Sequence, residues 1–305
     1  MSQTQSQNQG HGQGQSQNQS QGGDGPRTLS IRHVTRYDYT PPAAGIVTRM
    51  RLWPTRFDTQ DAGSWTVTAN GEPVTPALRG PFGVQEGLWS ADGPLEAVEV
   101  VAEGRVTRQD DAGVVRGLKE RAPPEVFLRT TERTAPDAAI RDLAASACQD
   151  DRLATLHALS AAVRDAIAYV PDTTDMGTQA AAALAQGEGV CQDHAHVFAA
   201  AARTLGIPAR YVAGYYFPGD ALPGTPSPSE PTVGAAVETH GWAEGHVPGL
   251  GWVGFDVANR VCPTREHVRV ACHLDASRAA LISGAVAGQT EERLTATVTI
   301  SQAQQ

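Results

Sequence analysis

The sequence predicts an α+β protein in which a small β-sandwich-like module precedes a larger core of helices packed on an antiparallel sheet. Two observations predict this order. Short stretches of alternating residues occupy the first third of the chain, and Ala-rich stretches with helical spacing follow them. The length of 305 residues is enough for one large hydrophobic core or two modest ones.

Residues 1–26 are predicted to form a disordered tail. Up to about Gly25 the segment consists almost entirely of Gln, Ser, Asn and Gly, and the string QSQNQ at residues 5–9 recurs at residues 15–19. Such a composition has no apolar surface whose burial would offset the entropy lost on ordering. The tail is therefore left out of the predicted fold.

Residues 27–120 are predicted as the β-rich module. Their first strand has an alternation that is typical of a strand with one buried face. That face carries Leu29, Ile31, His33, Thr35, Tyr37 and Tyr39. A second strand at residues 65–68 precedes the turn signal Asn70-Gly71, and alternation returns at residues 98–102.

Residues 121–305 are predicted as the core, because Pro123-Pro124 is followed by Ala-rich sequence with helical spacing. Helices are expected to begin at Pro136-Asp137 and to cover residues 153–167, 177–186 and 191–205, the last ended by a glycine and a proline. Strands are expected at residues 210–216, 239–247, 252–257 and 294–300. The segment 218–233, rich in Pro, Ser and Gly, is expected to be a mobile flap.

Cys191 is the strongest candidate for a functional residue. It opens a predicted helix after a Gly-rich turn, and unpaired N–H groups at a helix N-terminus favour the thiolate, which is the nucleophilic form of cysteine. A thiolate nucleophile needs an imidazole to hold its proton and a third group to orient that imidazole. His240 on one predicted strand and Asp256 on the next supply both. The sequence thus predicts a catalytic Cys191, His240 and Asp256, with the Cys191 N–H as one oxyanion donor and the segment 173–178 as the candidate for a second.

The hairpin between the two strands constrains this arrangement. Side chains alternate faces along a strand, so His240 and Asp256 share a face only if the numbers of paired residues sum to an even value. A two-residue loop at Gly249-Leu250 would give an odd sum. We therefore expect a three- or five-residue loop, or a bulge, that uses Gly249 or Gly251.

Three elements of the sequence resemble the bacterial transglutaminase-like superfamily: GVCQD at residues 189–193, HGW at 240–242 and GWVGFD at 251–256. They stand in the family's order and at its spacing, within the longer similar stretches 169–220 and 239–271. The string IRHVTRYDYTPPA at residues 31–43 resembles the β module that precedes this core in many such proteins.

The resemblance implies a papain-like core in which the Cys191 helix packs on a sheet that bears His240 and Asp256. It also implies acyl transfer through a thioester, released to water or to an amine. The chain departs from the family's pattern at three places. His194 stands where Phe is common, Gly241 replaces the Ala of HAW, and residues 272–276 replace an expected Gly-x-Asp-Tyr element.

The implied substrate is a protein or peptide. We favour hydrolysis, as in a cysteine protease or amidase, over transfer to an amine, because nothing in the sequence marks a lysine-binding site. The alternative is a catalytically inactive peptide-binding or assembly module with the same fold, motivated by Gly241 and by the missing tyrosine. The sequence does not specify the oligomeric state.

No metal or organic cofactor is implied. A zinc site would have to draw on Cys191, His194, His196, His240 and His246, but no CxxC or HExxH pattern occurs in the sequence. His194 and His196 are expected to be pocket-wall or surface residues.

Several neighbours of the candidate residues have simpler interpretations. Gln192 and Asp193 are expected to be exposed residues of the first helical turn. Trp242 and Trp252 are expected to be core aromatics.

Composition excludes some partners. The net charge of −9 and the pI near 5.4 argue against nucleic-acid binding and against attraction to an anionic membrane. No segment has the roughly 20 apolar residues that a membrane span needs, and no secretion signal is recognised, so a cytoplasmic protein is expected. Four scattered cysteines are too few for a disulfide scaffold, and reduced thiols are expected.

Overall fold

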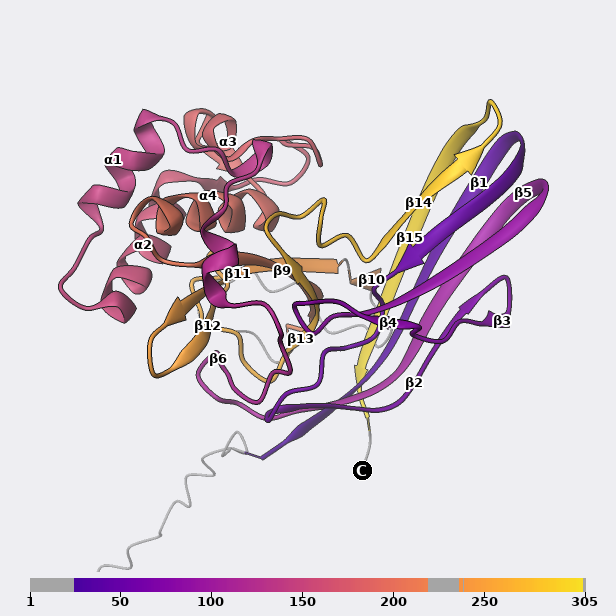
Figure 1. Ribbon diagram of the computed structural model, residues 1–305, viewed down its shortest axis with the longest axis horizontal. Coiled ribbons are helices and arrows are strands. Elements are labelled where there is room, and N and C mark those ends of the chain that lie inside the picture. The colour runs from indigo at the N-terminus through magenta and orange to yellow at the C-terminus, as the bar shows by residue number, and fades with distance from the viewer. Residues whose placement is uncertain (1–24, 219–235, 238, 304–305) are drawn as a thin grey trace, which may run out of the picture.

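The computed structural model describes residues 25–218, 236–237 and 239–303. The predicted tail lies almost entirely outside this range, and so does the predicted flap at residues 218–233. The described chain forms two large antiparallel sheets and a group of helices (Figure 1). No helix in the described part of the chain is long and apolar enough to cross a membrane.

The N-terminal region is built as an eight-stranded sheet. Its strands are β1 (Arg27–Met50), β2 (Gln60–Ala69), β3 (Glu72–Pro73), β4 (Leu78–Arg79), β5 (Gln85–Arg108), β10 (Ala236–Val237), β14 (Ile282–Ala287) and β15 (Glu291–Gln302). Their order is β10-β15-β1-β5-β2-β3, with β14 pairing β1 and β4 pairing β5. The predicted alternation holds in β1, where Leu29, Ile31, His33, Thr35 and Tyr39 are buried.

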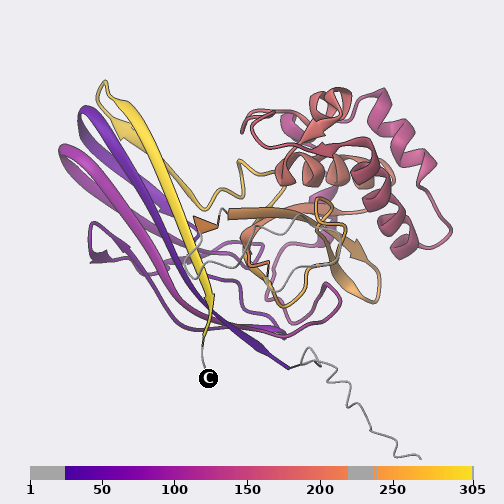
Figure 2. The ribbon, with the colours of Figure 1, turned by 180° about the vertical axis from the view of Figure 1, so that it is seen from behind.

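The sheet pairing departs from the predicted division of the chain at residue 121. That division placed residues 121–305 in the core, whereas β14 and β15 return to the N-terminal sheet and pair with β1. In this register Ile31 lies opposite Ile300 and His33 opposite Val298. The return satisfies the backbone groups along one edge of the 24-residue β1, which would otherwise be exposed for pairing with another chain. The views from the front and from behind both place β14 and β15 beside β1, away from the helices (Figures 1 and 2).

The core consists of a five-stranded sheet with helices against it. The strands run in the order β13-β9-β11-β12-β6, with β6 (Val114–Val115), β9 (Ala209–Tyr216), β11 (Thr239–Val247), β12 (Gly251–Phe255) and β13 (His267–His273). The helical elements are η1 (Pro124–Leu128), η2 (Glu132–Thr134), α1 (Ala138–Ser146), α2 (Arg152–Ala166), α3 (Ala180–Gln186) and α4 (Cys191–Thr204). Two short strands, β7 (Ala168–Tyr169) and β8 (Glu188–Gly189), pair in parallel just before α4.

Local signals set the helix ends. The side chains of Asp137 and Asp151 accept hydrogen bonds from N–H groups in the first turns of α1 and α2, as N-cap residues do. Gly187 ends α3 with φ of 73°, in the left-handed region that glycine adopts easily. The predicted helices are confirmed, although α3 begins three residues later than expected.

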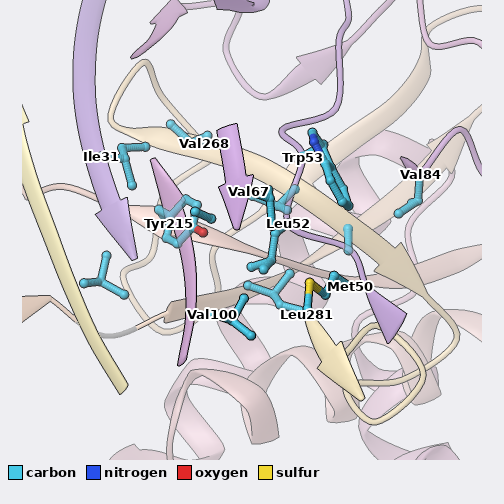
Figure 3. Packing of buried hydrophobic residues seen from close by; sticks show 14 of the residues in the cluster. Ile31, Met50, Leu52, Trp53, Val67, Val84, Val100, Tyr215, Val268 and Leu281 are labelled. Atoms are coloured by element: carbon cyan, nitrogen blue, oxygen red, sulfur yellow. The ribbon is translucent and has the colours of Figure 1, made fainter. Parts of the chain in front are cut away.

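The two sheets share one apolar core. Ile31, Val67 and Val100 from the N-terminal sheet pack in the same cluster as Tyr215 of β9 and Val268 of β13 (Figure 3). A second cluster lies between the five-stranded sheet and the helices, and it contains most of the buried face of α4. The five-stranded sheet is therefore covered on both sides, which fixes the strands that carry the candidate residues.

The predicted hairpin register is confirmed. Val247 pairs with Gly251 and Ala243 pairs with Phe255, so that paired numbers sum to 498 and the loop has three residues, 248–250. Gly249 and Gly251 have φ of 80° and 96°, which explains why glycines stand in this turn. The even sum places His240 and Asp256 on the same face of the sheet.

Candidate active site

Cys191 is the first residue of α4 and is half-buried. The helix behind it is buried on all sides, from Gln192 to Arg203, because its many alanines allow the sheet and the other helices to approach closely. The Cys191 N–H lies in the first turn, where backbone donors have no partner within the helix. The sulfur is thus held by a rigid element beside available N–H groups.

Asp193 holds the start of this helix. Its Oδ2 accepts hydrogen bonds from the backbone N–H of Val190 at 2.8 Å and from the hydroxyl of Thr174 at 2.7 Å. A Cβ at position 189 would lie 2.8 Å from the same oxygen, so Gly189 makes room for the carboxylate. The expectation that Gln192 and Asp193 are exposed was wrong. Both are buried, and both hydrogen-bond to the segment 173–178, through Thr174 and Asp175.

That segment had been the candidate source of a second oxyanion donor. Its Asp175 carbonyl oxygen accepts a hydrogen bond from the Gln192 amide at 3.4 Å. The segment therefore lies beside the start of α4, and the identity of a second donor stays a prediction.

His240 lies between the other two candidate residues. Its Nε2 is 2.7 Å from Oδ2 of Asp256, and Cys191 lies near enough for its negative charge to raise the pKa of the ring. Since Nε2 is used by Asp256, Nδ1 is the ring nitrogen left for an interaction with the sulfur. The structure thus brings together all three residues chosen from the sequence, from α4, β11 and the end of β12.

Two further residues bind Asp256, and sequence reasoning missed both. The amide Nδ2 of Asn259 donates to Oδ2 at 2.7 Å, and Nε2 of His267 lies 3.0 Å from the same oxygen. His267 opens β13, which is separated from β11 by β9. The only sequence signal was its place within the similar stretch 239–271, since nothing local connects it with Asp256.

The electrostatics of the site favour charges on its carboxylate and on the nearby imidazole. Burial by itself raises the pKa of Asp256, but His240 and His267 outweigh burial and hold that pKa well below its usual range. Burial lowers the pKa of His240, yet the negative charges of Asp256 and Cys191 outweigh it and raise the pKa well above 6.5. The result is an imidazole that binds a proton readily between a carboxylate and a sulfur.

A metal ion is the other chemistry that such a cluster suggests. In the described part of the chain, one ligand atom each from His240, Asp256 and His267 lie within 4.8 Å of one another. However, Nδ1 of His267 accepts the backbone N–H of Thr264 at 3.1 Å, so its Nε2 carries the proton and has no lone pair for a metal. This donor set therefore does not suit a cation.

Two of the other zinc candidates, His194 and His196, also point elsewhere. The ring nitrogens of His194 face the carbonyl oxygens of Val190 and Ile167 at 2.8 and 3.0 Å, and Nε2 of His196 accepts the N–H of Ala276 at 3.0 Å. Both rings are fully buried, so the expectation that they form a pocket wall or a surface was wrong. They connect α4 to the backbone around it.

Gly241 has a steric explanation. A Cβ built there would lie 2.1 Å from the hydroxyl oxygen of Tyr211, a buried residue of β9. The pKa of Tyr211 is raised well above 10 by burial and by the negative charges of Cys191 and Asp193, so its hydroxyl keeps its proton near the sulfur. The departure from HAW thus accommodates a tyrosine beside the candidate nucleophile. Trp242 and Trp252 are buried, as expected of core aromatics.

Comparisons with known proteins agree with this arrangement. Residues 141–257 match the family model described as the transglutaminase-like superfamily, and residues 29–107 match the bacterial transglutaminase-like N-terminal region. An uncharacterized protein of Mycobacterium leprae is 27% identical over 289 residues, which cover 90% of this chain and 98% of that one. The crystal structure of a candidate cysteine protease from Cytophaga hutchinsonii is similar with a TM-score of 0.67 and 18% identity, covering 92% of each chain. The last similarity concerns the fold alone.

Proposed function

Because the chain belongs to the transglutaminase-like superfamily, we propose that it catalyses acyl transfer or hydrolysis at amide bonds of a protein or peptide through a thioester on Cys191. The observation that carries the proposal is the position of His240, which contacts Asp256 at 2.7 Å and lies near enough to Cys191 for the two to interact electrostatically. A cytoplasmic location stays a prediction.

The proposed reaction has two halves. The Cys191 thiolate attacks the amide carbonyl, the Cys191 N–H donates to the oxyanion, and the imidazolium of His240 protonates the departing amine. His240 then takes a proton from the acceptor, which attacks the thioester and releases Cys191. Throughout, Asp256 accepts from Nε2 of His240 and keeps Nδ1 directed at the sulfur.

We propose water as the principal acceptor, which makes the protein a cysteine protease or amidase. The reason is that no residue of the described site marks a place for the lysine side chain of an acceptor protein. Transfer to an amine, as by a protein-glutamine acyltransferase, is the other outcome of the same thioester chemistry.

The proposal is tested with a diverse peptide library, with and without a small primary amine, and products are identified by mass spectrometry. We expect cleaved or deamidated peptides from the wild-type protein and none from Cys191→Ala. Cys148→Ala is the matched control, because Cys148 is an exposed cysteine remote from His240 in the sequence, and this variant should keep full turnover. Amide products that contain the added amine would reassign the protein to amine transfer.

Iodoacetamide labelling separates the enzyme from the inactive alternative without a known substrate. Cys191 should be alkylated at neutral pH faster than Cys148, although Cys148 is the more exposed thiol. Peptide binding without turnover, together with slow labelling of Cys191, would support an inactive binding module and contradict the proposed function.

A further inference from the structure

His267 is buried beside the proposed catalytic residues, and the mechanism above does not use it. Its side chain is fully buried at the start of β13, and Nε2 lies 3.0 Å from Oδ2 of Asp256. On the far side of the ring, Nδ1 lies 3.1 Å from the backbone nitrogen of Thr264. Both ring nitrogens therefore have hydrogen-bond partners, Asp256 on one side of the ring and Thr264 on the other.

These partners determine where the proton of His267 sits. The backbone N–H of Thr264 is a donor only, so Nδ1 must accept and Nε2 must carry the hydrogen. The Thr264 hydroxyl donates instead to a carboxylate oxygen of Glu266 at 2.6 Å. Burial also lowers the pKa of His267, which keeps the ring neutral. A neutral imidazole in this tautomer is a fixed donor to Asp256.

The same oxygen of Asp256 receives the hydrogen bond from His240 at 2.7 Å. His267 approaches that oxygen from β13, which lies two places from β11, the strand of His240, so rotation of the carboxylate would break both contacts. The ring of Tyr216 lies against both histidines, with centroids 5.3 Å from His240 and 4.5 Å from His267. The two imidazoles and the carboxylate are thus held as one packed unit.

We propose that His267 is a positioning residue of this active site, which donates from Nε2 to Asp256 and so holds the carboxylate in the orientation that directs Nδ1 of His240 at Cys191. The inference rests on the proposed function. Without this donor, Asp256 keeps Asn259 as a partner but loses the contact from β13. His240 then spends less time in reach of the sulfur, while the surface that binds substrate is unchanged.

Two substitutions of His267 distinguish its hydrogen bond to Asp256 from its hydrogen bond to Thr264. In His267→Asn the amide oxygen can replace Nδ1 as acceptor for Thr264, but the side chain is too short to reach Asp256. In His267→Gln the amide nitrogen can replace Nε2 as donor. We expect the asparagine variant to lose roughly 10- to 100-fold in kcat with KM within about twofold, and the glutamine variant to recover most of that loss.

His273→Asn is the matched control, since it makes the same change at the other end of β13, where the imidazole contacts the backbone N–H of Leu274. It should leave kcat unchanged. Equal losses in His267→Asn and His267→Gln, or a rise in KM without a fall in kcat, would overturn the positioning role.

The rate of Cys191 alkylation distinguishes a failure of this inference from a failure of the proposed function, because it needs no substrate. Fast labelling of both the wild type and His267→Asn overturns the inference alone, and slow labelling of the wild type overturns both. If the asparagine variant does not fold, nitrogen NMR of the wild-type histidines at pH 7 decides. We expect the Nε2–H tautomer for His267, and an Nδ1–H tautomer contradicts the inference.

Discussion

Two buried carboxylates lie in the same five-stranded sheet, and their partners differ in kind. Glu244 on β11 is bound by two arginines, with Nε of Arg210 at 2.6 Å from Oε2 and Nε of Arg269 at 2.8 Å from Oε1. Asp256, after β12, is bound by His240 and His267 at 2.7 and 3.0 Å. Both carboxylates are fully buried.

The partners determine what each carboxylate can do. Arginine keeps its charge at any accessible pH, so the group around Glu244 has a fixed charge and serves packing. Arg210 also lies over the Trp252 ring at 3.7 Å, which ties this ion pair to the core. Imidazole gains and loses a proton near neutrality, so the group around Asp256 can take part in proton transfer. The comparison predicts that damage at Asp256 affects catalysis and damage at Glu244 affects stability.

Asp256→Asn should have the largest effect. The amide cannot hold His240 in the tautomer that directs Nδ1 at Cys191, so we expect kcat to fall by roughly 10³- to 10⁴-fold, as for the equivalent change in a serine protease triad. The melting temperature should fall as well, because His240 and His267 hold the pKa of the buried carboxyl well below its usual range and its charge therefore stabilises the fold. Activity is for that reason compared per folded molecule. Asp165→Asn removes an exposed carboxylate and serves as the control. Full activity in Asp256→Asn would end the proposed distinction between the two carboxylates.

Glu244→Gln should have the opposite profile. It leaves Arg210 and Arg269 buried without their common counter-charge, which costs about 3 kcal/mol or more in the free energy of unfolding. Activity per folded molecule should stay near that of the wild type. Glu103→Gln breaks an exposed ion pair and should cost less than about 1 kcal/mol. Urea unfolding of the three proteins measures both values, and equal costs in the two variants would contradict the prediction.

The features that could be predicted from the sequence are those set by residues close together along the chain. The start of α4 at Cys191 follows from glycines and an extended residue before it, and the parity of the hairpin follows from strand geometry. Contacts across the sheet were beyond this reasoning. His267 reaches Asp256 because β13 joins the same sheet next to β9, in the order β13-β9-β11-β12. No local pattern in the sequence contains this order.

The same reason explains two other differences. The last strand, β15, was predicted as a strand, but its partner is a strand more than 250 residues earlier in the chain. Asp193 was taken as exposed because acidic residues in a first helical turn usually face water. Its burial depends on Thr174, which reaches it from a different segment.

A third prediction concerns the loss of the stabilising contribution of Glu244 at acid pH. Although burial raises the pKa of Glu244, Arg210 and Arg269 outweigh burial and lower it from 4.5 to about 2. Between pH 4.5 and about 2 the Glu244 carboxyl is therefore protonated in the unfolded state but ionised in the folded state. The contribution of its charge to the free energy of unfolding is complete above about pH 4.5 and is lost as the pH falls toward 2. The shift corresponds to about 3 kcal/mol.

The measurement is the difference in unfolding free energy between the wild type and Glu244→Gln at pH 7, 5, 4 and 3. The difference should be constant from pH 7 to 5 and should narrow below that. Protonation of Asp256 destabilises both proteins alike and cancels in the comparison. A difference that stays constant to pH 3 would show that the arginines do not lower the pKa of Glu244.

The smallest expected effect concerns β11, in which His240 is the second residue and Glu244 lies three residues before the end. Gly241→Ala places a Cβ about where the Tyr211 hydroxyl lies, and such overpacking costs about 1–3 kcal/mol. The strain falls next to His240, so kcat should drop by roughly tenfold or more. Adding Tyr211→Phe removes the nearest atom, so the double variant should lose less stability than the sum of the losses in the two single variants.

Glu244 lies further along the strand, so Gly241→Ala should not disturb it. The contribution of Glu244 to the free energy of unfolding should therefore decrease below pH 5 in a Gly241→Ala background just as it does in the wild type. If Gly241→Ala keeps wild-type stability and kcat, Tyr211 moves aside freely, and the tight packing of that tyrosine against the strand of His240 is not needed for the reaction.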